Sequence, residues 1–528
     1  MRKERLAERK PLSFSTTMRN PERIASFLAC IKDFEGYELT SDVIKKIIKN
    51  VLHKGLYETT YQRKDKDLLD KVKSQEEQYT DEQLDDIIIK NPQNHKEAGF
   101  NHGWDSRFDT WYKLPKEFGF LYYEMNKPIE ISTTGHMLID AYQQNPSNEQ
   151  KIQNVFLNAL AKYQSDNPFR KNKNSNVPLM LLLNVIQLLK QDKEENDAGV
   201  FRQELSILIC WQNNDAYALY QYLKQLRKEV GFTYSDEYIY ERCLVLLEGD
   251  ETKKNRFKIS QICGESVDEY IRKMRSTGII SLRGNGRFLD FNQFEIDKIR
   301  YLLQKYSNYP IFSDKKSYYK YMGQIDSQIV SIESNINLDT SEIRKKTLHQ
   351  YAKNYTPEQI FDELKKLSAN KRIESKDPVF KFIPAPTRLE FLTSIALIQQ
   401  FPTLVVNPNY IVDDEGLPTC TASGGMADIV VLDVAYDSLF EVTLMRGRQD
   451  QVNNEIVPIR RHLMEYKKIK ENAFSVFIAP SIHEDTKEMA SWYKYKDNLD
   501  ILTFDILTFL ENIKHKSSLF QLIQMIES

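Results

Sequence analysis

Two apolar runs near the C-terminal end of the chain predict a β-hairpin. Residues 427–434 and 438–444 are rich in Val, Ile, Leu and Phe, and a short polar link joins them. Each run carries one carboxylate, and a four-residue link at 433–436 places Asp428 directly opposite Glu441, with Cβ atoms about 5 Å apart. Two like charges at that distance repel each other, whereas a divalent cation between them makes the arrangement favourable. The alternative is a pair of acids on the solvent face of an edge hairpin.

The residues around this hairpin alternate between helical and strand patterns. The expected elements, in chain order, are helix 387–400, strand 404–412, the hairpin, helix 450–471, strand 474–478, a further helix, strand 501–504 and a last helix. This order predicts an α/β sandwich with a mixed sheet. It is the order of elements in metal-dependent nucleases of the PD-(D/E)xK type, whose hairpin carries Asp and then Glu-x-Lys.

The position of the expected lysine holds Thr443. Thr443 and Glu441 share a face of the strand, because side chains alternate, so Thr443 points toward the metal but supplies no positive charge. Another group or a second metal ion must then stabilise the transition-state phosphate. Arg446 and Lys467 are within reach in the sequence.

Three more polar residues near the hairpin are candidates, and each has a structural alternative. Glu455 could bind a metal or a metal-bound water, or could simply be a first-turn acid that the helix dipole favours. Glu390 completes the pattern Thr387-x-x-Glu390, a capping box that accounts for a Glu at that position. His462 is expected to pack or to form a hydrogen bond rather than to act as a base.

Residues 257–303 contain a second informative pattern: a short helix, a second helix and a basic hairpin. Apolar residues recur on one face of the second helix, 267–278, and its three basic residues lie off that face. This is the order of a winged helix, whose second helix enters the major groove and whose wing touches phosphate. The alternative is a solvated basic helix beside an arbitrary hairpin. The residues expected to contact DNA are Arg272, Lys273, Arg275, Arg283, Asn285 and Arg287.

The patterns divide the chain into four parts. Residues 1–165 mix helices with a short β element, and 166–312 hold an apolar helix and the winged-helix-like unit. Residues 313–375 are a polar, helical connector, and 376–528 form the α/β part. The predicted fold class is therefore α+β and multidomain, with a mainly helical N-terminal half, a helical linker and a C-terminal α/β domain of the PD-(D/E)xK type.

Composition is that of an ordinary soluble globular protein, with 41% hydrophobic and 28% charged residues. No apolar run is long enough to span a membrane, and no apolar segment follows the N-terminus as a secretory signal would. Five scattered cysteines show no CxxC spacing, which argues against disulfides and zinc and fits a cytoplasmic location. The net charge of −2 requires a DNA-binding protein to separate its charges by face or by domain.

The candidate residues lie in segments that resemble a known family. The chain is similar to AlwI-type type IIS restriction endonucleases, a family that includes strand-specific nicking enzymes. The resemblance covers much of the chain, and its most specific motifs lie in the C-terminal part. The segments that carry it are Phe14–Pro21, Gly119–Leu138, Pro408–Asp413, Ala427–Ile429, Phe440–Thr443 and Pro458–His462.

The resemblance implies an enzyme with separate recognition and cleavage parts. Residues 1–165 and 166–312 would recognise a short asymmetric DNA site, and 376–528 would cut a few bases outside it. It implies Mg²⁺, for which Mn²⁺ may substitute. It gives a catalytic role to Asp428, Glu441 and Glu455 and suggests one for Glu390. The metal ligands would be Asp428, Glu441 and the Val442 carbonyl. The family also lacks the lysine, so Thr443 is compatible with activity.

The implied partners follow from the number of cleavage centres. One such centre cuts one strand of double-stranded DNA, so cutting both requires transient pairing of cleavage domains or a small second subunit. A cognate DNA methyltransferase is expected in the same system, and no membrane is expected. The alternatives are a strand-specific nicking endonuclease, the large subunit of a heterodimeric restriction enzyme or, from another class, a non-catalytic winged-helix DNA-binding protein.

Overall fold

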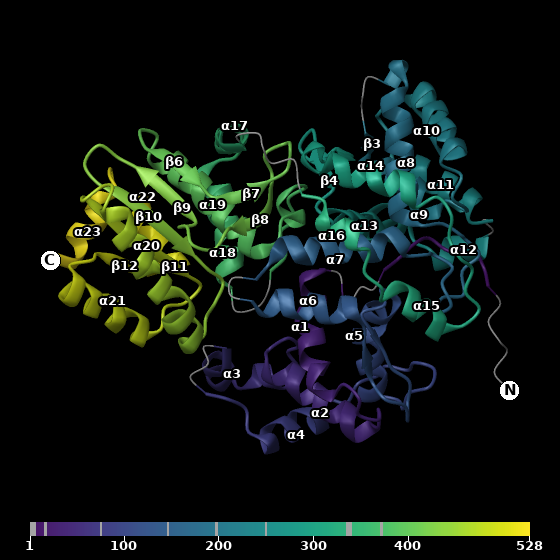
Figure 1. The fold of residues 1–528 in the computed structure, drawn as a ribbon, viewed down its shortest axis with the longest axis horizontal. Coiled ribbons are helices and arrows are strands. Elements are labelled where there is room, and N and C mark those ends of the chain that lie inside the picture. The colour runs from purple at the N-terminus through teal and green to yellow at the C-terminus, as the bar shows by residue number, and fades with distance from the viewer. Residues whose placement is uncertain are drawn as a thin grey trace. The chain divides into compact units, whose positions relative to one another are not determined.

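The protein forms two compact units, whose helices and strands are drawn in Figure 1. Unit 1 comprises residues 1–57 and 88–336, and unit 2 comprises residues 58–87 and 337–528. The computed structural model describes residues 7–14, 18, 20–73, 77–144, 147–195, 199–248, 251–333, 340–369 and 373–527. Residues 15–17 and 19, part of one segment of the family resemblance, lie outside the described residues. The finer division into four parts stays a prediction, although unit 2 also includes residues 58–87.

Unit 1 is mainly helical. Its helices are α1 (Glu22–Ile31), α2 (Ser41–His53), α5 (Trp104–Glu117), α6 (Thr133–Gln143), α7 (Glu149–Lys162), α8 (Pro178–Gln191), α9 (Leu205–Cys210), α10 (Ala216–Val230), α11 (Asp236–Leu246), α12 (Glu251–Arg256), α13 (Ser266–Arg275), α14 (Ile296–Lys305), α15 (Lys315–Met322) and α16 (Ser327–Ser331). Short strands β1 (Leu121–Tyr122) and β2 (Glu130–Ile131) pair antiparallel. They confirm the β element predicted within residues 1–165.

A small antiparallel sheet follows α13 in unit 1. Its order is β3 (Val200–Phe201), β5 (Phe288–Phe291), β4 (Ile280–Arg283). The predicted hairpin is confirmed, and Asn285 in its turn has a φ of 56°. The predicted break between two helices is wrong, because the π-helical turn η5 (Ser260–Glu265) runs directly into α13 with helical backbone angles at the junction.

Unit 2 contains a five-stranded mixed sheet with helices around it. Its helices are α3 (Lys66–Lys73), α4 (Asp81–Lys90, which crosses the unit boundary), α17 (Thr340–Asn354), α18 (Pro357–Ser368), α19 (Ala385–Gln400), α20 (Val457–Lys467), α21 (Glu484–Asp497), α22 (Ile506–Lys514) and α23 (Phe520–Glu527). Its strands are β6 (Val405–Pro408), β7 (Tyr410–Val412), β8 (Pro418–Ala422), β9 (Ile429–Leu432), β10 (Asp437–Val442), β11 (Ala473–Ala479) and β12 (Ile501–Asp505).

The sheet order is β12–β11–β10–β9–β6. Strand β11 pairs parallel with both β10 and β12, whereas β9 pairs antiparallel with both β10 and β6. The mixed sheet predicted from the alternating pattern is therefore confirmed. The β9–β10 hairpin lies inside the sheet rather than at its edge, so the edge-hairpin alternative is wrong.

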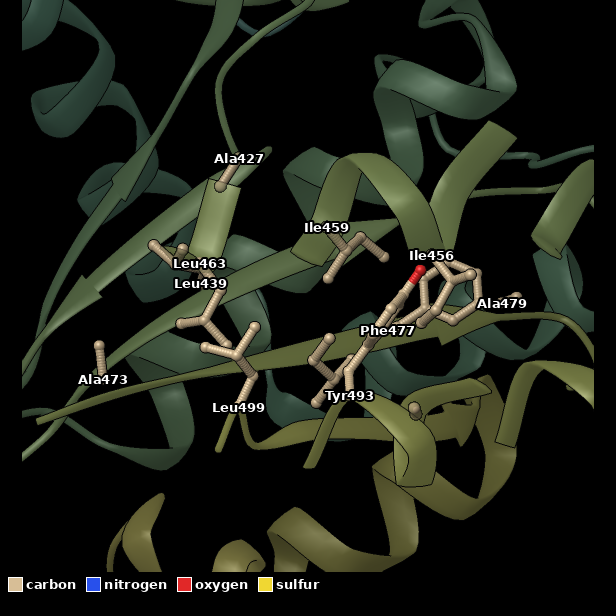
Figure 2. Packing of buried hydrophobic residues seen from close by; sticks show 12 residues of the cluster. Ala427, Leu439, Ile456, Ile459, Leu463, Ala473, Phe477, Ala479, Tyr493 and Leu499 are labelled. Atoms are coloured by element: carbon tan, nitrogen blue, oxygen red, sulfur yellow. The ribbon is translucent and has the colours of Figure 1, made fainter. Parts of the chain in front are cut away.

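One apolar cluster fixes α20 against the sheet. Ile456, Ile459 and Leu463 recur at helical spacing and pack with Leu439 of β10 and Phe477 of β11 (Figure 2). All five side chains are buried from solvent. This packing holds the start of α20, together with the π-helical turn η8 (Asp450–Ile456) before it, over the strand that carries Glu441.

Two local predictions in unit 2 fail for identifiable reasons. Helix α19 begins at Ala385, so Thr387 lies inside it and does not cap it. The strand predicted at 404–412 divides at Asn409, whose backbone N–H donates to the Asp428 carbonyl and whose side-chain amide donates to the Ala427 carbonyl. The second piece, β7, pairs instead with β8, a strand that the sequence pattern missed.

The predicted connector at 313–375 is helical but does not stand apart from the units. Helices α15 and α16 belong to unit 1, and α17 and α18 belong to unit 2, where both pack against α19. Thr356 and Gln359 form a capping box at the start of α18: the Thr356 hydroxyl accepts a hydrogen bond from the Gln359 N–H, and the Gln359 side chain accepts one from the Thr356 N–H. None of the described helices combines the length and apolar character needed to cross a bilayer.

Candidate active site

The hairpin has the register that the sequence predicts. Phe440 of β10 pairs with Ile429 of β9, so the next step of the same ladder sets Glu441 opposite Asp428. The link between the strands is the predicted four residues, 433–436. Opposed residues share one face of a sheet, so both carboxylates lie on the same side.

Protein groups hold both carboxylates in place. The Val442 N–H donates to Asp428 Oδ2 at 2.7 Å, and the Asp428 N–H in turn faces the Glu441 carboxylate. His462 of α20 places its Nδ1 2.8 Å from Glu441 Oε1. Its other ring nitrogen, Nε2, is buried with no hydrogen-bond partner in the described part of the chain. The expectation that His462 forms a hydrogen bond is thereby confirmed.

A third carboxylate joins the pair from η8. Glu455 lies close enough to Asp428 and Glu441 for their charges to interact, and the Thr443 side chain hydrogen-bonds with it. Strand β10 thus supplies Glu441, the end of that strand supplies Thr443, and the turn before α20 supplies Glu455. The structure brings these candidates together.

Burial and mutual repulsion raise the pKa of all three carboxyl groups. Burial and then the charge of Glu441 raise the pKa of Asp428 well above its usual range. Burial and then Glu455 do the same to the pKa of Glu441. Burial and then Asp428 raise the pKa of Glu455 to about 8. No lysine or arginine in the described part of the chain forms an ion pair with any of them.

The donor set fits Mg²⁺ only as an open site. Within the described residues, no three or more His, Cys, Asp or Glu side chains form a ready-made metal cage. Mg²⁺ does not need one, because it usually keeps several waters and binds through one or two carboxylates together with substrate phosphate. Two opposed carboxylates of raised pKa, with no lysine or arginine paired to them among the described residues, suit that mode of binding.

The remaining candidates of the sequence make contacts elsewhere. Glu390 is buried on α19, where its Oε2 accepts a hydrogen bond from the Ala422 N–H on β8. Arg446 donates to the carbonyls of Ser368 and Ala369. Lys467 lies 3.5 Å from the Ala473 carbonyl. These contacts bring neither cation to the three carboxylates.

The basic residues of α13 do not lie as predicted. Lys273 is fully buried and Arg275 is nearly so, whereas both were expected off the buried face. The N-terminal segment covers this side of the helix: Lys273 Nζ donates to the Met18 carbonyl and lies 5.7 Å from the centre of the Phe14 ring. Arg272 is partly buried. The expectation that Lys273 and Arg275 lie on an exposed face of the helix is therefore wrong, and their contact with DNA stays a prediction.

The hairpin of unit 1 keeps an exposed tip. Asn285 and Arg287 are exposed, and the guanidinium of Arg287 lies 5.8 Å from the centre of the Phe201 ring. Arg283 is different, because its Nε donates to Asp290 Oδ2 at 2.7 Å. Lys190 of α8 reaches the same carboxylate at 2.9 Å. Asp290 therefore holds Arg283 within the protein, although Lys190 shares the same carboxylate, whereas no ion pair of Arg287 is found in the described part of the chain.

Sequence reasoning missed the supporting contacts more than the carboxylates. The Val442 and Asn409 N–H groups both donate to Asp428, and a pattern of residue types does not predict such backbone hydrogen bonds. The His462 contact with Glu441 carried one weak signal, since His462 lies three residues, about one helical turn, after Ile459, which packs against the sheet.

Comparison with known proteins identifies the family. A sequence model described as AlwI restriction endonuclease matches residues 116–356 and 325–511. Together the two matches cover more than half of the chain and include all the candidate catalytic residues. The chain belongs to the AlwI restriction endonuclease family. Restriction endonucleases are site-specific nucleases that bind double-stranded DNA, and the family resemblance seen in the sequence is confirmed.

Solved structures of restriction endonucleases show a weak overall likeness. The small subunit (R.BspD6I2) of the heterodimeric restriction endonuclease R.BspD6I is 22% identical with a TM-score of 0.26, over 32% of this chain and 86% of that chain. Restriction endonuclease FokI is 12% identical with a TM-score of 0.25, over 99% and 98% of the two chains. FokI bound to DNA is 11% identical with a TM-score of 0.24 over the same shares. No curated protein matches the chain significantly.

Proposed function

We propose that this chain is a type IIS restriction endonuclease. Unit 1 binds a short asymmetric site in double-stranded DNA, and unit 2 hydrolyses phosphodiester bonds a few bases outside it. The observation that carries the proposal is the opposed pair Asp428 and Glu441, whose repulsion no lysine or arginine of the described chain relieves. Family membership supports the class of reaction.

The opposed carboxylates and the Val442 carbonyl would hold the metal. They are hard oxygen ligands, which Mg²⁺ prefers and Mn²⁺ accepts. A bound Mg²⁺ supplies charge stabilisation at the scissile phosphate and lowers the pKa of a coordinated water. In this arrangement the Val442 N–H fixes the orientation of Asp428, and His462 fixes that of Glu441.

The other acids have different roles. Glu455, which hydrogen-bonds with Thr443, would orient the attacking water. Its pKa is about 8 without metal, and a cation bound between Asp428 and Glu441 would lower it, so that Glu455 could then accept the proton of the water. Glu390 would act indirectly: its bond to Ala422 fixes the end of β8, from which the chain leads to Asp428. In-line attack by the water leaves a 5′-phosphate and a 3′-hydroxyl.

DNA recognition belongs to unit 1 in this proposal. The sheet order β3–β5–β4 after α13 is consistent with a winged helix, although the helices before it are not separated by a turn. The exposed Asn285 and Arg287 at the hairpin tip would touch the DNA backbone, and the contribution of Arg283 is smaller because Asp290 already binds it. A DNA methyltransferase with the same site would protect the host DNA.

Cleavage of both strands requires a second centre, because one set of carboxylates hydrolyses one strand. A transient pair of cleavage domains would supply it, as would a small second subunit. The ratio of nicked to linear plasmid at low and high protein concentration separates these cases. Linear product that rises with protein concentration indicates self-pairing, and nicked product at every concentration indicates a nicking enzyme or a missing subunit.

The decisive test is metal-dependent cleavage of DNA by matched variants. The wild type should cut plasmid DNA with Mg²⁺, and EDTA or Asp428→Asn should abolish the cutting. Asp433→Asn is the control, because it makes the same chemical change at the other end of the hairpin. Sequencing of products from a random-sequence library then gives the recognition site and the cut offset together.

Two outcomes would count against the proposal. Sequence-specific binding without cleavage, unaffected by metal or by Asp428→Asn, would favour a non-catalytic DNA-binding protein. Cleavage that persists in Asp428→Asn at the wild-type rate would remove the opposed carboxylates from the mechanism.

A further inference from the structure

Arg107 of unit 1 is a partly buried cation with no counter-charge among the residues that the structure describes. It lies in α5, with its guanidinium 4.8 Å from the centre of the Tyr57 ring and 5.6 Å from that of Trp111. Its Nε is buried and has no hydrogen-bond acceptor in the described part of the chain. No described carboxylate forms an ion pair with it. Burial alone lowers the pKa of this guanidinium, although an arginine stays charged.

The polar partners of Arg107 are the Tyr57 side chain, with which it hydrogen-bonds, and His95. Arg107 Nη1 lies 2.6 Å from His95 Nε2. A guanidinium has only donors, so His95 Nε2 must accept and the ring proton must sit on Nδ1. Burial and the charge of Arg107 lower the pKa of His95, which keeps the ring neutral. His95 Nδ1 is also buried, and no described group accepts its hydrogen.

The site is therefore short of acceptors and of negative charge. Within the described residues, Arg107 Nε–H and His95 Nδ1–H have no acceptor, and no carboxylate neutralises the positive charge of Arg107. Buried charges are normally paired, and buried donors are normally bonded. Two other arginines of unit 1 follow that rule: Arg170 binds Glu117, and Arg227 binds Glu204.

We infer that Arg107 and His95 form a contact site for a DNA backbone phosphate in unit 1. A phosphate oxygen supplies both the missing acceptors and the missing charge, and arginine pairs with phosphate through parallel N–H···O bonds. Both side chains keep part of their surface exposed, so a phosphate can approach from solvent. This inference rests on the proposed DNA-cleaving function, and it assigns DNA binding to residues outside the winged-helix-like hairpin.

The aromatic rings explain why an uncompensated cation is tolerated in the free protein. A guanidinium over Tyr57 and Trp111 gains electrostatic attraction from the faces of the rings. That interaction also keeps the long side chain in one position, so less conformational entropy is lost when a phosphate binds. A purely structural role for the stack predicts effects on folding but none on the salt dependence of DNA binding.

The test compares salt dependence rather than affinity alone. Binding of a mixed-sequence DNA duplex is measured by fluorescence anisotropy in EDTA, at salt concentrations from about 50 to 200 mM. Arg107→Gln should bind about tenfold more weakly at low salt, and the slope of log K against log salt should fall in magnitude by about 0.9, the loss of one phosphate contact. Arg107→Lys should keep the wild-type slope. His95→Ala should weaken binding with the slope unchanged, because its ring is neutral.

Arg300→Gln is the matched control, since Arg300 is an exposed arginine of unit 1 already paired with Asp297. Circular dichroism and thermal unfolding confirm that each variant is folded, and Arg107→Lys keeps the test valid if Arg107→Gln is not. Wild-type slope and affinity in folded Arg107→Gln would overturn the inference while leaving the proposed function intact. If Arg107→Gln does not fold, an Arg107→Lys slope smaller than that of the wild type would overturn it. Failure of the wild type to bind any duplex would overturn both.

Discussion

Two buried glutamates, one in each unit, have opposite electrostatic surroundings. Glu204 of unit 1 is fully buried and accepts two hydrogen bonds from Arg227, each of 2.7 Å, and a third from the Tyr234 hydroxyl at 3.0 Å. Glu441 of unit 2 is 6% exposed and faces two other acids, Asp428 and Glu455.

The surroundings of a buried carboxylate distinguish a structural role from a role in binding a cation. A buried carboxylate that serves the structure is neutralised by its own chain, because an unpaired buried charge is destabilising. A carboxylate that binds a cation cannot be neutralised in advance without losing its affinity. The same residue type therefore has two roles, and the charges around it identify which.

The largest expected effect concerns catalysis. Glu441→Gln keeps the shape of the side chain but removes one metal-binding charge, so cleavage of plasmid DNA in Mg²⁺ should fall to background. Glu204→Gln makes the same change in unit 1 and should leave cleavage measurable at temperatures where it is folded. DNA binding in EDTA should be retained by Glu441→Gln; its loss would show that the variant is misfolded or that Glu441 contributes to binding rather than to chemistry.

The second effect concerns folding, and it arises in unit 1 rather than in unit 2. Glu204→Gln removes one of the two counter-charges of the buried Arg227 and leaves Glu195 as the other, so it should lower the free energy of unfolding by about 1.5–3 kcal/mol. Urea denaturation followed by circular dichroism measures it. Glu488→Gln, at an exposed position of α21, is the control and should change stability little. A loss below about 1 kcal/mol in Glu204→Gln would mean that the bonds to Arg227 are not important for stability.

The third effect is an increase in the free energy of unfolding, whereas the second is a decrease. In EDTA at pH 8, Glu441→Gln should raise the free energy of unfolding by on the order of 1 kcal/mol, because it relieves the repulsion that raises the pKa values of the cluster. Added Mg²⁺ should stabilise the wild type more than the variant. If the variant is destabilised in EDTA as Glu204→Gln is, the acids are not repelling each other in the metal-free protein.

The fourth effect is a pH dependence of the metal-free protein. The pKa of Glu455 is raised to about 8 when folded, so the folded state holds a proton that the unfolded state releases above pH about 4.5. The free energy of unfolding should therefore fall as pH rises from about 4.5 to 8. Glu455→Gln should lack this contribution, so its stability relative to the wild type should grow with pH. A constant difference across that range would contradict the raised pKa.

The smallest effect concerns the hairpin of unit 1. Arg287→Ala should reduce the salt dependence of DNA binding by about one phosphate contact, with a modest loss of affinity. Arg283→Ala should change the slope less, because the Arg283 side chain is already bound to Asp290. Equal slopes in the wild type and both variants would remove the hairpin from the DNA interface.

Much of unit 2 could be predicted from the sequence because its strands are marked by β-branched runs. The pairing of Asp428 with Glu441 followed from the length of one turn, since a hairpin register is fixed by its loop. The division of strand 404–412 at Asn409 could not be predicted, because it depends on hydrogen bonds to Ala427 and Asp428.

Unit 1 was harder to predict because its contacts join residues far apart in the chain. Periodicity correctly placed α13 but could not show that the N-terminal segment covers Lys273, a contact between residues 18 and 273. A second face of a helix is solvent-exposed only if nothing else packs there, and the pattern of one segment does not contain that information. The burial of Arg275 has the same origin in tertiary packing.

The polypeptide passes between the two units three times, after residues 57, 87 and 336. A protease that cuts only the connection after residue 336 would leave residues 58–87 attached to the rest of the N-terminal sequence. Those residues nevertheless belong to unit 2, where Asp70 acts electrostatically on Arg446. Transplanting residues 337–528 alone onto another DNA-binding scaffold would leave that piece behind. A portable cutting module from this protein must therefore be built from two fragments or by circular permutation.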